Sequence, residues 1–498
     1  MHYQVIFSFA IYFSILLAIG LFSHKKSQTE VDFILGNRSL NFWLTALSAH
    51  ASDMSAWLFM AMPAAIFIGG IPHIWMALGL LIGMFLNWQF VAPKLRTLTE
   101  EYKSNTLSTF FEKRFRDESG TIRLVTAFLS LVFLTCYLSA GLIAMGYLFE
   151  SLFSINFYVG IVIAVSVVIA YTFVGGFVAV AWTDLFQGFF LLFMVLMVPL
   201  VALSKIGGIG SVISNAASQG ISLQIMDDYS TYSFVSIIMI VLGWGLGYFG
   251  QPHIITKFMG IRDVSEIWKA KFLGMTWQFL ALGGAIFVGV VGIGYFPEGL
   301  ANGELVFVDM VKSLFHPFIG GIILCAVLAA NISTMDSQIL VCASVITEDL
   351  YKRYYRRQAE SSELLKISRT SVVFIGILAF IFATSKSATV TGAVFYAWGG
   401  LGSAFGPLVL TSLYSTSVNR YGALAGIIVG GVLAGTWDLM NPYFTTFVIP
   451  PMVPAFTLSL ISILIVSKMT RKNEKINHEN SKNYFKSSDN SRMSKVII

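Results

Sequence analysis

The chain has 498 residues, of which 56% are hydrophobic and only 12% are charged, whereas charged residues make up about a quarter of an ordinary soluble domain. This composition excludes a soluble globular protein and indicates a protein that lies in a lipid bilayer. Apolar stretches of about 20 residues, the length that a membrane-spanning helix needs, recur from Val5 to Ser467. The alternation of polar and apolar residues that is typical of membrane barrels is not found. We therefore predict an all-α polytopic membrane protein.

The formal net charge is +6, but residues 468–498 alone hold eight basic and three acidic residues, so the rest of the chain is nearly neutral. This polar tail lacks the interleaved aromatic residues of a nucleic-acid surface, and we expect it to be disordered. The three cysteines lie in apolar segments at spacings that match no metal or redox motif. We expect no nucleic acid and no obligate protein partner.

The apolar pattern predicts thirteen spans. In chain order they lie near residues 4–22, 41–70, 73–93, 121–149, 157–176, 184–204, 232–252, 270–296, 316–348, 367–384, 390–415, 420–437 and 447–467. No cleavable signal peptide is expected, because the first residues lack a basic region and a small-residue cleavage site.

The basic residues support these spans, because short loops rich in Lys and Arg stay on the cytoplasmic side. With the N-terminus outside, only Lys205, Lys312 and Lys386 of the 32 Lys and Arg residues fall in outer loops. The others, including a cluster at 257–271, fall in inner loops or the tail. We expect a multi-pass protein of the bacterial inner (plasma) membrane, with an external N-terminus and a cytoplasmic C-terminus.

Two spans have sequences that predict broken helices. Span 2 places Asp53 at membrane depth ahead of Pro63 and a glycine pair, and span 7 has four glycines from Gly243 to Gly250 with Pro252 close behind. Gly and Pro also serve simple packing and kinking in membrane helices, which is the alternative explanation.

The two predicted breaks lie five spans apart and favour two structural repeats, residues 41–204 and 232–415. Secondary transporters build such repeats around a site near the middle of the bilayer. We predict a single transmembrane domain, residues 1–467, followed by the tail at 468–498.

Three acids, Asp53, Asp184 and Asp336, lie in or at the edge of apolar spans, where a charge costs at least about 2.5 to 3.5 kcal/mol. The spans offer almost no Lys or Arg as partners, so the acids favour a path for a cation or a proton. The alternative for Asp53 and Asp184 is that each caps a helix from within the membrane.

Span 9 carries Ser333, Asp336, Ser337 and Leu340 on one helical face. Sodium is a hard cation that prefers oxygen ligands, and the hydroxyls of Ser333 and its neighbour Thr334 suit it. The alternative is that these hydroxyls hold neighbouring helices together.

Motifs of other protein classes are missing or out of place. The run from Gly245 to Gly250 matches GxGxxG but lies inside a membrane span without a preceding strand. The sequence contains no HExxH, GxSxG or P-loop motif. We therefore expect no enzyme and no cofactor, and a transporter that draws on an ion gradient.

Five segments resemble the solute:sodium symporter family, and within it the bacterial sodium/proline symporters. They are LGNRSL at 35–40, ASDMSAW at 51–57, YTFVGGFVAVAWTD at 171–184, GWGLGYFGQPHII at 243–255 and LAANISTMDSQILVCASVITEDLY at 328–351. The resemblance covers nearly the whole chain. It implies a thirteen-helix chain with a leucine-transporter-like core of two inverted repeats of five helices, with broken helices 2 and 7.

The resemblance also implies a sodium site, in which sodium is a co-transported ion. Its ligands would be the carbonyls of Ala51, Met54 and Ala330 and the hydroxyls of Ser333 and Thr334.

Further positions match residues of the family that couple sodium to the solute or lie on a cation path. They are Asp53, Ser55, Asp184, Asp336 and Ser337. Asp184, Ser333, Asp336 and Ser337 together resemble a second sodium site of some relatives, so the number of ions stays open.

The solute positions implied by the resemblance are Trp57, Tyr137, Trp244, Tyr248 and Pro252. An apolar ring would pack on these aromatic faces while a carboxylate meets the N–H groups of a broken helix. This chemistry suits L-proline. The chain departs from the family pattern at Ala56 and Asn331.

We predict sodium-coupled symport of L-proline by alternating access. The alternatives are symport of another small solute, such as pantothenate or a different carboxylate or amino acid, and a solute sensor or channel derived from a transporter. A sensor would be expected to add a folded cytoplasmic domain, and a channel would not need paired broken helices.

Overall fold

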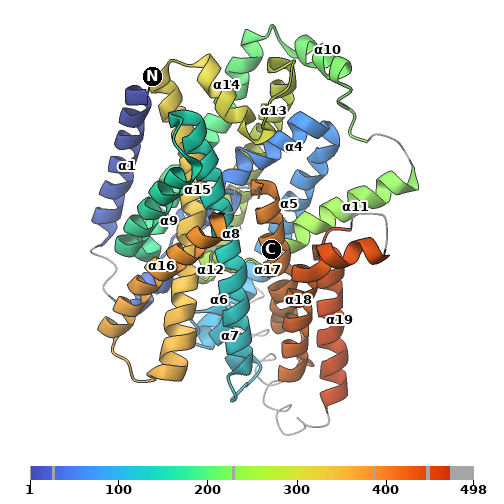
Figure 1. The fold of residues 1–498 in the computed structure, drawn as a ribbon. Coiled ribbons are helices and arrows are strands. Elements are labelled where there is room, and N and C mark those ends of the chain that lie inside the picture. The colour runs from blue at the N-terminus through green and yellow to red at the C-terminus, as the bar shows by residue number, and fades with distance from the viewer. Residues whose placement is uncertain (1, 25–28, 227–229, 385–388, 445–448, 472–498) are drawn as a thin grey trace.

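The computed structural model describes residues 2–24, 29–226, 230–384, 389–444 and 449–471. Within these ranges almost all residues are helical, and the only pairing of β type is an isolated bridge between Leu40 and Ile261. The all-α architecture that the sequence predicts is confirmed (Figure 1). The tail at 472–498 lies outside the described residues.

The α-helices follow one another along the chain without a sheet between them. They are α1 (His2–His24), α2 (Glu30–Leu35), α3 (Phe42–Met54), α4 (Ala61–Gly69), α5 (Ile74–Leu86), α6 (Ala92–Glu101), α7 (Leu107–Arg114), α8 (Thr121–Phe153), α9 (Phe157–Lys205), α10 (Ile209–Gln219), α11 (Thr231–Gly245), α12 (Pro252–Met259), α13 (Ile267–Tyr295), α14 (Val306–Leu314), α15 (Pro317–Ser344), α16 (Ser361–Ala383), α17 (Val390–Tyr414), α18 (Arg420–Phe444) and α19 (Met452–Thr470). Short 3-10 or π segments join or extend some of them, among them η2 (Ala56–Leu58), η5 (Leu246–Gly250) and η8 (Val345–Tyr355).

Each predicted span has an apolar helix at its position. Within the described ranges, ten helices are long and apolar enough to cross a membrane, and the bent pair Phe42–Met54 and Ala56–Gly69 counts as one more. The two remaining predicted spans coincide with the shorter apolar helices Tyr3–Ile19 and Phe157–Ala170. The number of membrane crossings stays a prediction.

The predicted spans 5 and 6 are joined in one long element, α9. The chain turns at Gly176, whose φ of 68° and ψ of −177° are not helical. A positive φ is easy only for glycine, so this position lets α9 change direction without a connecting loop.

The first predicted helix break is found between α3 and α4, which are bent by 68° relative to each other. Ser55 ends α3 with a φ of 47°, a conformation that costs a non-glycine residue of order 1 to 3 kcal/mol. The second break follows η5, where Gln251 is extended before Pro252 starts α12. Both predicted interruptions are therefore confirmed.

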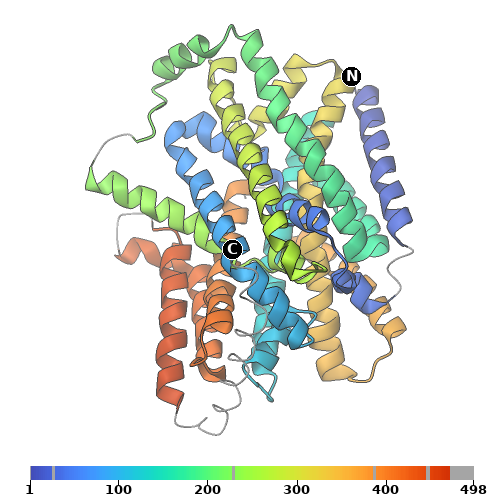
Figure 2. The same cartoon turned by 180° about the vertical axis from the view of Figure 1, so that it is seen from behind.

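The helices outside the two predicted repeats, α1, α18 and α19, flank the core on opposite sides. α1 packs beside α15, where the Ser8 hydroxyl donates a hydrogen bond to the Phe318 carbonyl at 2.8 Å. α18 and α19 pack side by side at the opposite edge of the molecule (Figures 1 and 2).

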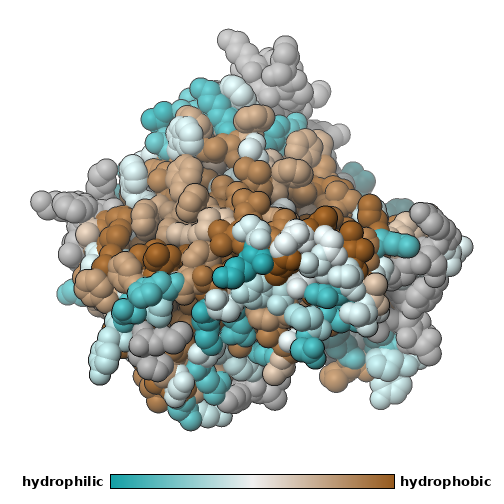
Figure 3. All heavy atoms as spheres, turned by 90° about the horizontal axis from the view of Figure 1, so that it is seen from above, coloured by the Kyte–Doolittle hydropathy of each residue, from teal (hydrophilic) through white to brown (hydrophobic). Residues whose placement is uncertain are grey.

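Large apolar side chains face outward on several spans, as in a protein surrounded by lipid; Phe193 and Phe279 are 63% and 65% exposed. Seen from above, the surface also has a broad hydrophobic area across its middle (Figure 3).

The helices can be assigned to two opposite ends of the molecule, and the side of the membrane that each end faces stays a prediction. The N-terminus lies at the same end of the molecule as α10 and α14, whereas α6 and α7 lie at the other end (Figure 1). Lys312 belongs to α14, at the first end, and Lys94 and Arg96 belong to α6, at the second.

Reporter fusions test this orientation. A reporter fused after Lys468 is expected to be cytoplasmic, and one inserted near Gln224, between α10 and α11, is expected to be external. Reporter activity or accessibility labelling in intact cells gives the side. If both reporters lie on the same side, the number of spans between them is wrong.

Candidate functional site

The break after α3 supplies free backbone acceptors at the centre of the molecule. Asn41 caps the start of α3 by accepting a hydrogen bond from the Leu44 N–H. At the other end Ser55 turns the chain away, so the carbonyls of the last helical turn, from Ala51 to Met54, lose their usual intrahelical donors. Such carbonyls are suited to hold a cation.

One hydroxyl of α15 meets one of these carbonyls, and two bonds lie within α15 itself. The Ser333 hydroxyl donates hydrogen bonds to the carbonyls of Ala51, at 2.8 Å, and Ala330, at 3.0 Å. The Thr334 hydroxyl donates to the Ala330 carbonyl at 3.2 Å. The structure thus brings together four of the five predicted sodium ligands, and the fifth, Met54, is buried at the end of the same helical turn.

A second polar group lies one turn from these residues. The Asp184 carboxylate of α9 accepts hydrogen bonds from the hydroxyls of Ser48, at 2.5 Å, and Ser52, at 3.1 Å. The hydroxyls of Ser52 and Ser337 share a hydrogen bond at 2.8 Å. Asp184 and Ser337 are therefore linked through the Ser52 hydroxyl.

The third acid, Asp336, is fully buried and accepts a hydrogen bond from the Thr172 hydroxyl at 2.7 Å. One carboxylate oxygen of Asp336 and one of Asp184 have no hydrogen-bond partner within the described part of the chain.

Asp184 has a basic partner, which the sequence did not lead us to expect. Lys257, which the sequence analysis assigned to an inner loop, is only 1% exposed and forms an ion pair with Asp184 at 3.3 Å. Its ammonium group also lies 4.9 Å from the centre of the Phe177 ring. The expectation that the buried acids have no basic partner is wrong for Asp184. The reason is that α12 begins at Pro252 inside the protein, so its basic residue lies against α3 and α9.

Asp53 lies beside Tyr248, one of the residues predicted to contact the solute. It accepts a hydrogen bond from the Tyr248 hydroxyl at 2.5 Å, and that hydroxyl in turn accepts one from the Gln278 amide at 2.9 Å. The Ser55 hydroxyl accepts from the Trp57 N–H at 3.2 Å and so stabilises the break itself.

Four of the five predicted solute residues line one cavity: Trp57, Tyr137, Trp244 and Tyr248. The rings of Trp57 and Trp244 lie 5.1 Å apart, centre to centre. The fifth, Pro252, is buried but does not line this cavity; it begins α12.

Trp398 of α17 also lines the cavity and was missed by sequence reasoning. Its ring lies 5.1 Å from the Tyr248 ring, and its indole N–H donates to the Trp244 carbonyl at 3.1 Å. A Cβ at Gly247 would lie only 2.0 Å from the Trp398 ring, so the glycine permits this packing. The glycine-rich run after Trp398 was the available signal.

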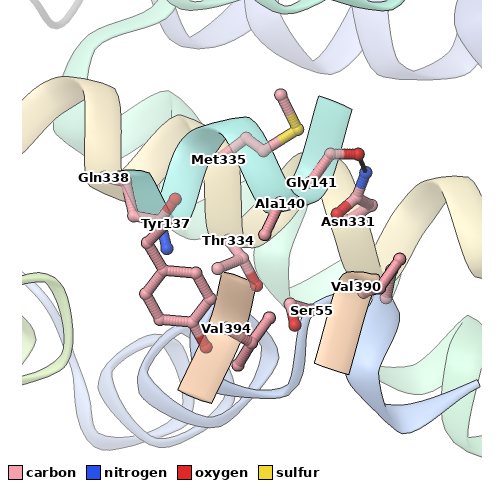
Figure 4. Close-up of a pocket in the computed structure, with 11 residues that line it drawn as sticks. Ser55, Tyr137, Ala140, Gly141, Asn331, Thr334, Met335, Gln338, Val390 and Val394 are labelled. Atoms are coloured by element: carbon pink, nitrogen blue, oxygen red, sulfur yellow. Dashed lines mark hydrogen bonds between the residues drawn. The ribbon is translucent and has the colours of Figure 1, made fainter. Parts of the chain in front are cut away.

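A second cavity adjoins the first, with Tyr137 and Val394 common to both. It runs along α15 past Thr334 and is also lined by Ser55, Asn331 and Gln338 (Figure 4). The Asn331 amide donates to the Gly141 carbonyl of α8 at 2.6 Å, so this departure from the family pattern links two helices.

Comparisons with known proteins agree with this architecture. A model of the sodium:solute symporter family matches residues 33–430. The chain is 41% identical over 460 residues to the high-affinity proline transporter PutP of Bacillus subtilis, covering 92% of this chain and 96% of the relative. It is 39% identical over 469 residues to the sodium/proline symporter of Escherichia coli, with 92% of each chain covered.

Among solved structures, the chain resembles a substrate-bound, outward-open sodium-coupled sialic acid symporter, with a TM-score of 0.80 over 94% of this chain and 98% of that one. The sequence identity is 18%, so the likeness shows the fold. The leucine-transporter-like architecture is confirmed.

The ion pair of Lys257 and Asp184 predicts a non-additive effect of mutations. Lys257→Met should lower the free energy of unfolding by about 3 to 5 kcal/mol, because it leaves a buried carboxylate without its cation. Adding Asp184→Asn should restore much of this loss. Chemical unfolding of the purified protein in detergent measures both.

Lys366→Met, at an exposed position, is the control. Strictly additive losses would show that the pair does not interact.

Proposed function

The chain belongs to the sodium:solute symporter family, and from this premise we propose that it takes up L-proline together with sodium by alternating access. The observation that supports the proposal is the break at Ser55, where carbonyl and hydroxyl oxygens lie next to an aromatic cavity. The relatives that match over nearly their whole length are named as proline transporters.

Sodium is proposed to bind between α3 and α15. Its ligands are the carbonyls of Ala51, Met54 and Ala330 and the hydroxyls of Ser333 and Thr334. The hydrogen bonds from Ser333 to the Ala51 and Ala330 carbonyls support this, because the same oxygens can coordinate a cation that lies between them. Neutral oxygens replace the water shell of sodium without holding it irreversibly.

The acids are proposed to serve coupling and the inward path of the ion. Asp53 and Ser55 join the break to the solute cavity through Tyr248 and Trp57. Asp184, Asp336 and Ser337 lie along α9 and α15. Since Lys257 already pairs with Asp184, the group has one built-in cation.

The aromatic side chains around this cavity offer the kind of surface on which a small apolar ring packs. Trp57, Tyr137 and Trp244 offer ring faces on which a pyrrolidine ring packs. We propose that Tyr248 lines this site too, and that Pro252 acts indirectly, by starting α12. The cavity lining contains no Arg or Lys, which a multiply charged anion would require.

Sodium and the solute are coupled because both sites adjoin the break at the end of α3. Sodium at the end of α3 orders the same turn that supports the cavity, so each ligand raises the affinity for the other. We propose that the protein is a transporter without enzymatic activity, in the bacterial plasma membrane, with an external N-terminus, and that residues 1–467 form its single domain, with repeats at 41–204 and 232–415.

Uptake into proteoliposomes tests the function. Labelled L-proline should accumulate when sodium is higher outside than inside, and accumulation should fall to the leak rate without the gradient. A competition panel of amino acids and simple carboxylates gives the specificity. Accumulation that is independent of sodium would refute the proposal.

Removing both α15 hydroxyls tests the sodium site. Ser333→Ala with Thr334→Ala should raise the sodium concentration for half-maximal uptake at least about tenfold, because each lost ligand weakens a site linked to solute affinity. If the two hydroxyls only hold helices together, through hydrogen bonds that average about 0.6 kcal/mol, the sodium concentration for half-maximal uptake should stay unchanged.

The matched control for the sodium test is Thr411→Ala with Ser412→Ala. These buried neighbours on α17 donate only to carbonyls of their own helix. A stable Ser333 and Thr334 double mutant with an unaltered sodium half-saturation would place the cation elsewhere.

Removing one aromatic ring tests the solute cavity. Trp244→Ala should weaken L-proline binding by about 1 to 3 kcal/mol through lost ring packing, while sodium binding without solute persists. Equilibrium binding of labelled proline measures the effect, and Trp268→Ala, at a position 61% exposed, is the control. Equal proline affinity in both variants would argue against this cavity.

A further inference from the structure

Gln338 of α15 is a buried polar side chain without a hydrogen-bond partner. It is 1% exposed, and neither its amide nitrogen nor its amide oxygen has a partner among the described residues. Within those residues, only His253 shares this property of two unpartnered polar side-chain atoms. A buried polar group without a partner is costly, so its presence calls for a ligand or a special role.

The position of Gln338 places it at the solute site. It lies one helical turn beyond Thr334 on the same face of α15, and both residues line the second cavity. The carboxamide is directed toward Tyr137, the residue that this cavity shares with the aromatic one (Figure 4). His253 meets the same tyrosine, with the two rings edge to face at 5.6 Å.

The chemistry of a carboxamide matches an amino-acid head group. Its nitrogen donates and its oxygen accepts, whereas an amino-acid zwitterion offers a carboxylate that accepts and an ammonium group that donates. Gln338 can therefore pair with both groups at once. A simple carboxylate would engage the nitrogen alone and leave the amide oxygen buried without a partner.

We propose that Gln338 is a specificity-determining residue that binds the zwitterionic head group of the solute. Its carboxamide donates to the carboxylate and accepts from the ammonium group. Gln338 thereby selects imino and amino acids over carboxylates that lack the nitrogen. This inference rests on the proposed function and adds the feature of the solute that the aromatic rings cannot recognise.

Gln338→Met tests the proposal, because methionine has a similar length and no hydrogen-bonding amide. The purified protein is saturated with sodium, and labelled L-proline is displaced by unlabelled L-proline or by cyclopentanecarboxylate, which has the same ring size and carboxylate but no nitrogen. The mutation should raise the L-proline dissociation constant about 10- to 100-fold. The constant for cyclopentanecarboxylate should change much less. An unchanged L-proline constant, or an equal loss for both ligands, would overturn the proposal.

Stability and a matched variant separate binding from structure. The polar atoms of the Gln338 side chain have no partner among the described residues. The variants Gln338→Met and Gln338→Leu should therefore unfold at the same temperature as the parent protein or higher. If both variants unfold earlier or fail to fold, the amide has a structural role and the proposal is wrong. Gln187→Met is the control, because Gln187 is equally buried but donates to the Tyr12 hydroxyl, away from the cavity.

Binding of L-proline to the parent protein separates a failure of the proposed function from a failure of the role of Gln338. If it binds no L-proline in the presence of sodium, the proposed function fails. If it binds L-proline and Gln338→Met binds it equally well, only the role of Gln338 fails.

Discussion

The architecture of the site depends on one constraint, the interruption of a helix inside the membrane. A backbone in lipid must satisfy its own hydrogen bonds, so the end of α3 at Ser55 is tolerated only because neighbouring helices surround it. Ser55 holds a positive φ, and its hydroxyl binds the N–H of Trp57. One carbonyl that the break releases, that of Ala51, accepts a hydrogen bond from Ser333 of α15.

One face of α15 is therefore proposed to serve two ligands. Ser333 and Thr334 face the end of α3, and Gln338 faces Tyr137 one turn further along. An ion and a solute that bind to the same short stretch of helix cannot be independent of each other. The fixed ion pair of Lys257 and Asp184 lies beside this stretch and limits the negative charge that a mobile cation must balance.

The spans and both helix breaks could be predicted because apolar length and runs of Gly and Pro are local properties of a sequence. The hydroxyls of the proposed sodium site, Ser333 and Thr334, could also be named, because they are adjacent polar residues in an apolar span and match the pattern of the family. The burial of Lys257 could not be predicted, because it depends on where α12 starts relative to α3 and α9. Trp398 and Gln338 were missed for a similar reason: each meets its neighbours only after helices distant in sequence pack together.

The most direct test of coupling through the break is the dissociation constant of L-proline for the purified protein, measured over a range of sodium concentrations. Sodium affinity is measured in parallel, with and without L-proline. Sodium should lower the proline constant to a plateau, and saturating L-proline should tighten sodium binding by the same factor, because coupling between two sites is reciprocal. A proline dissociation constant that does not change with sodium would contradict the account.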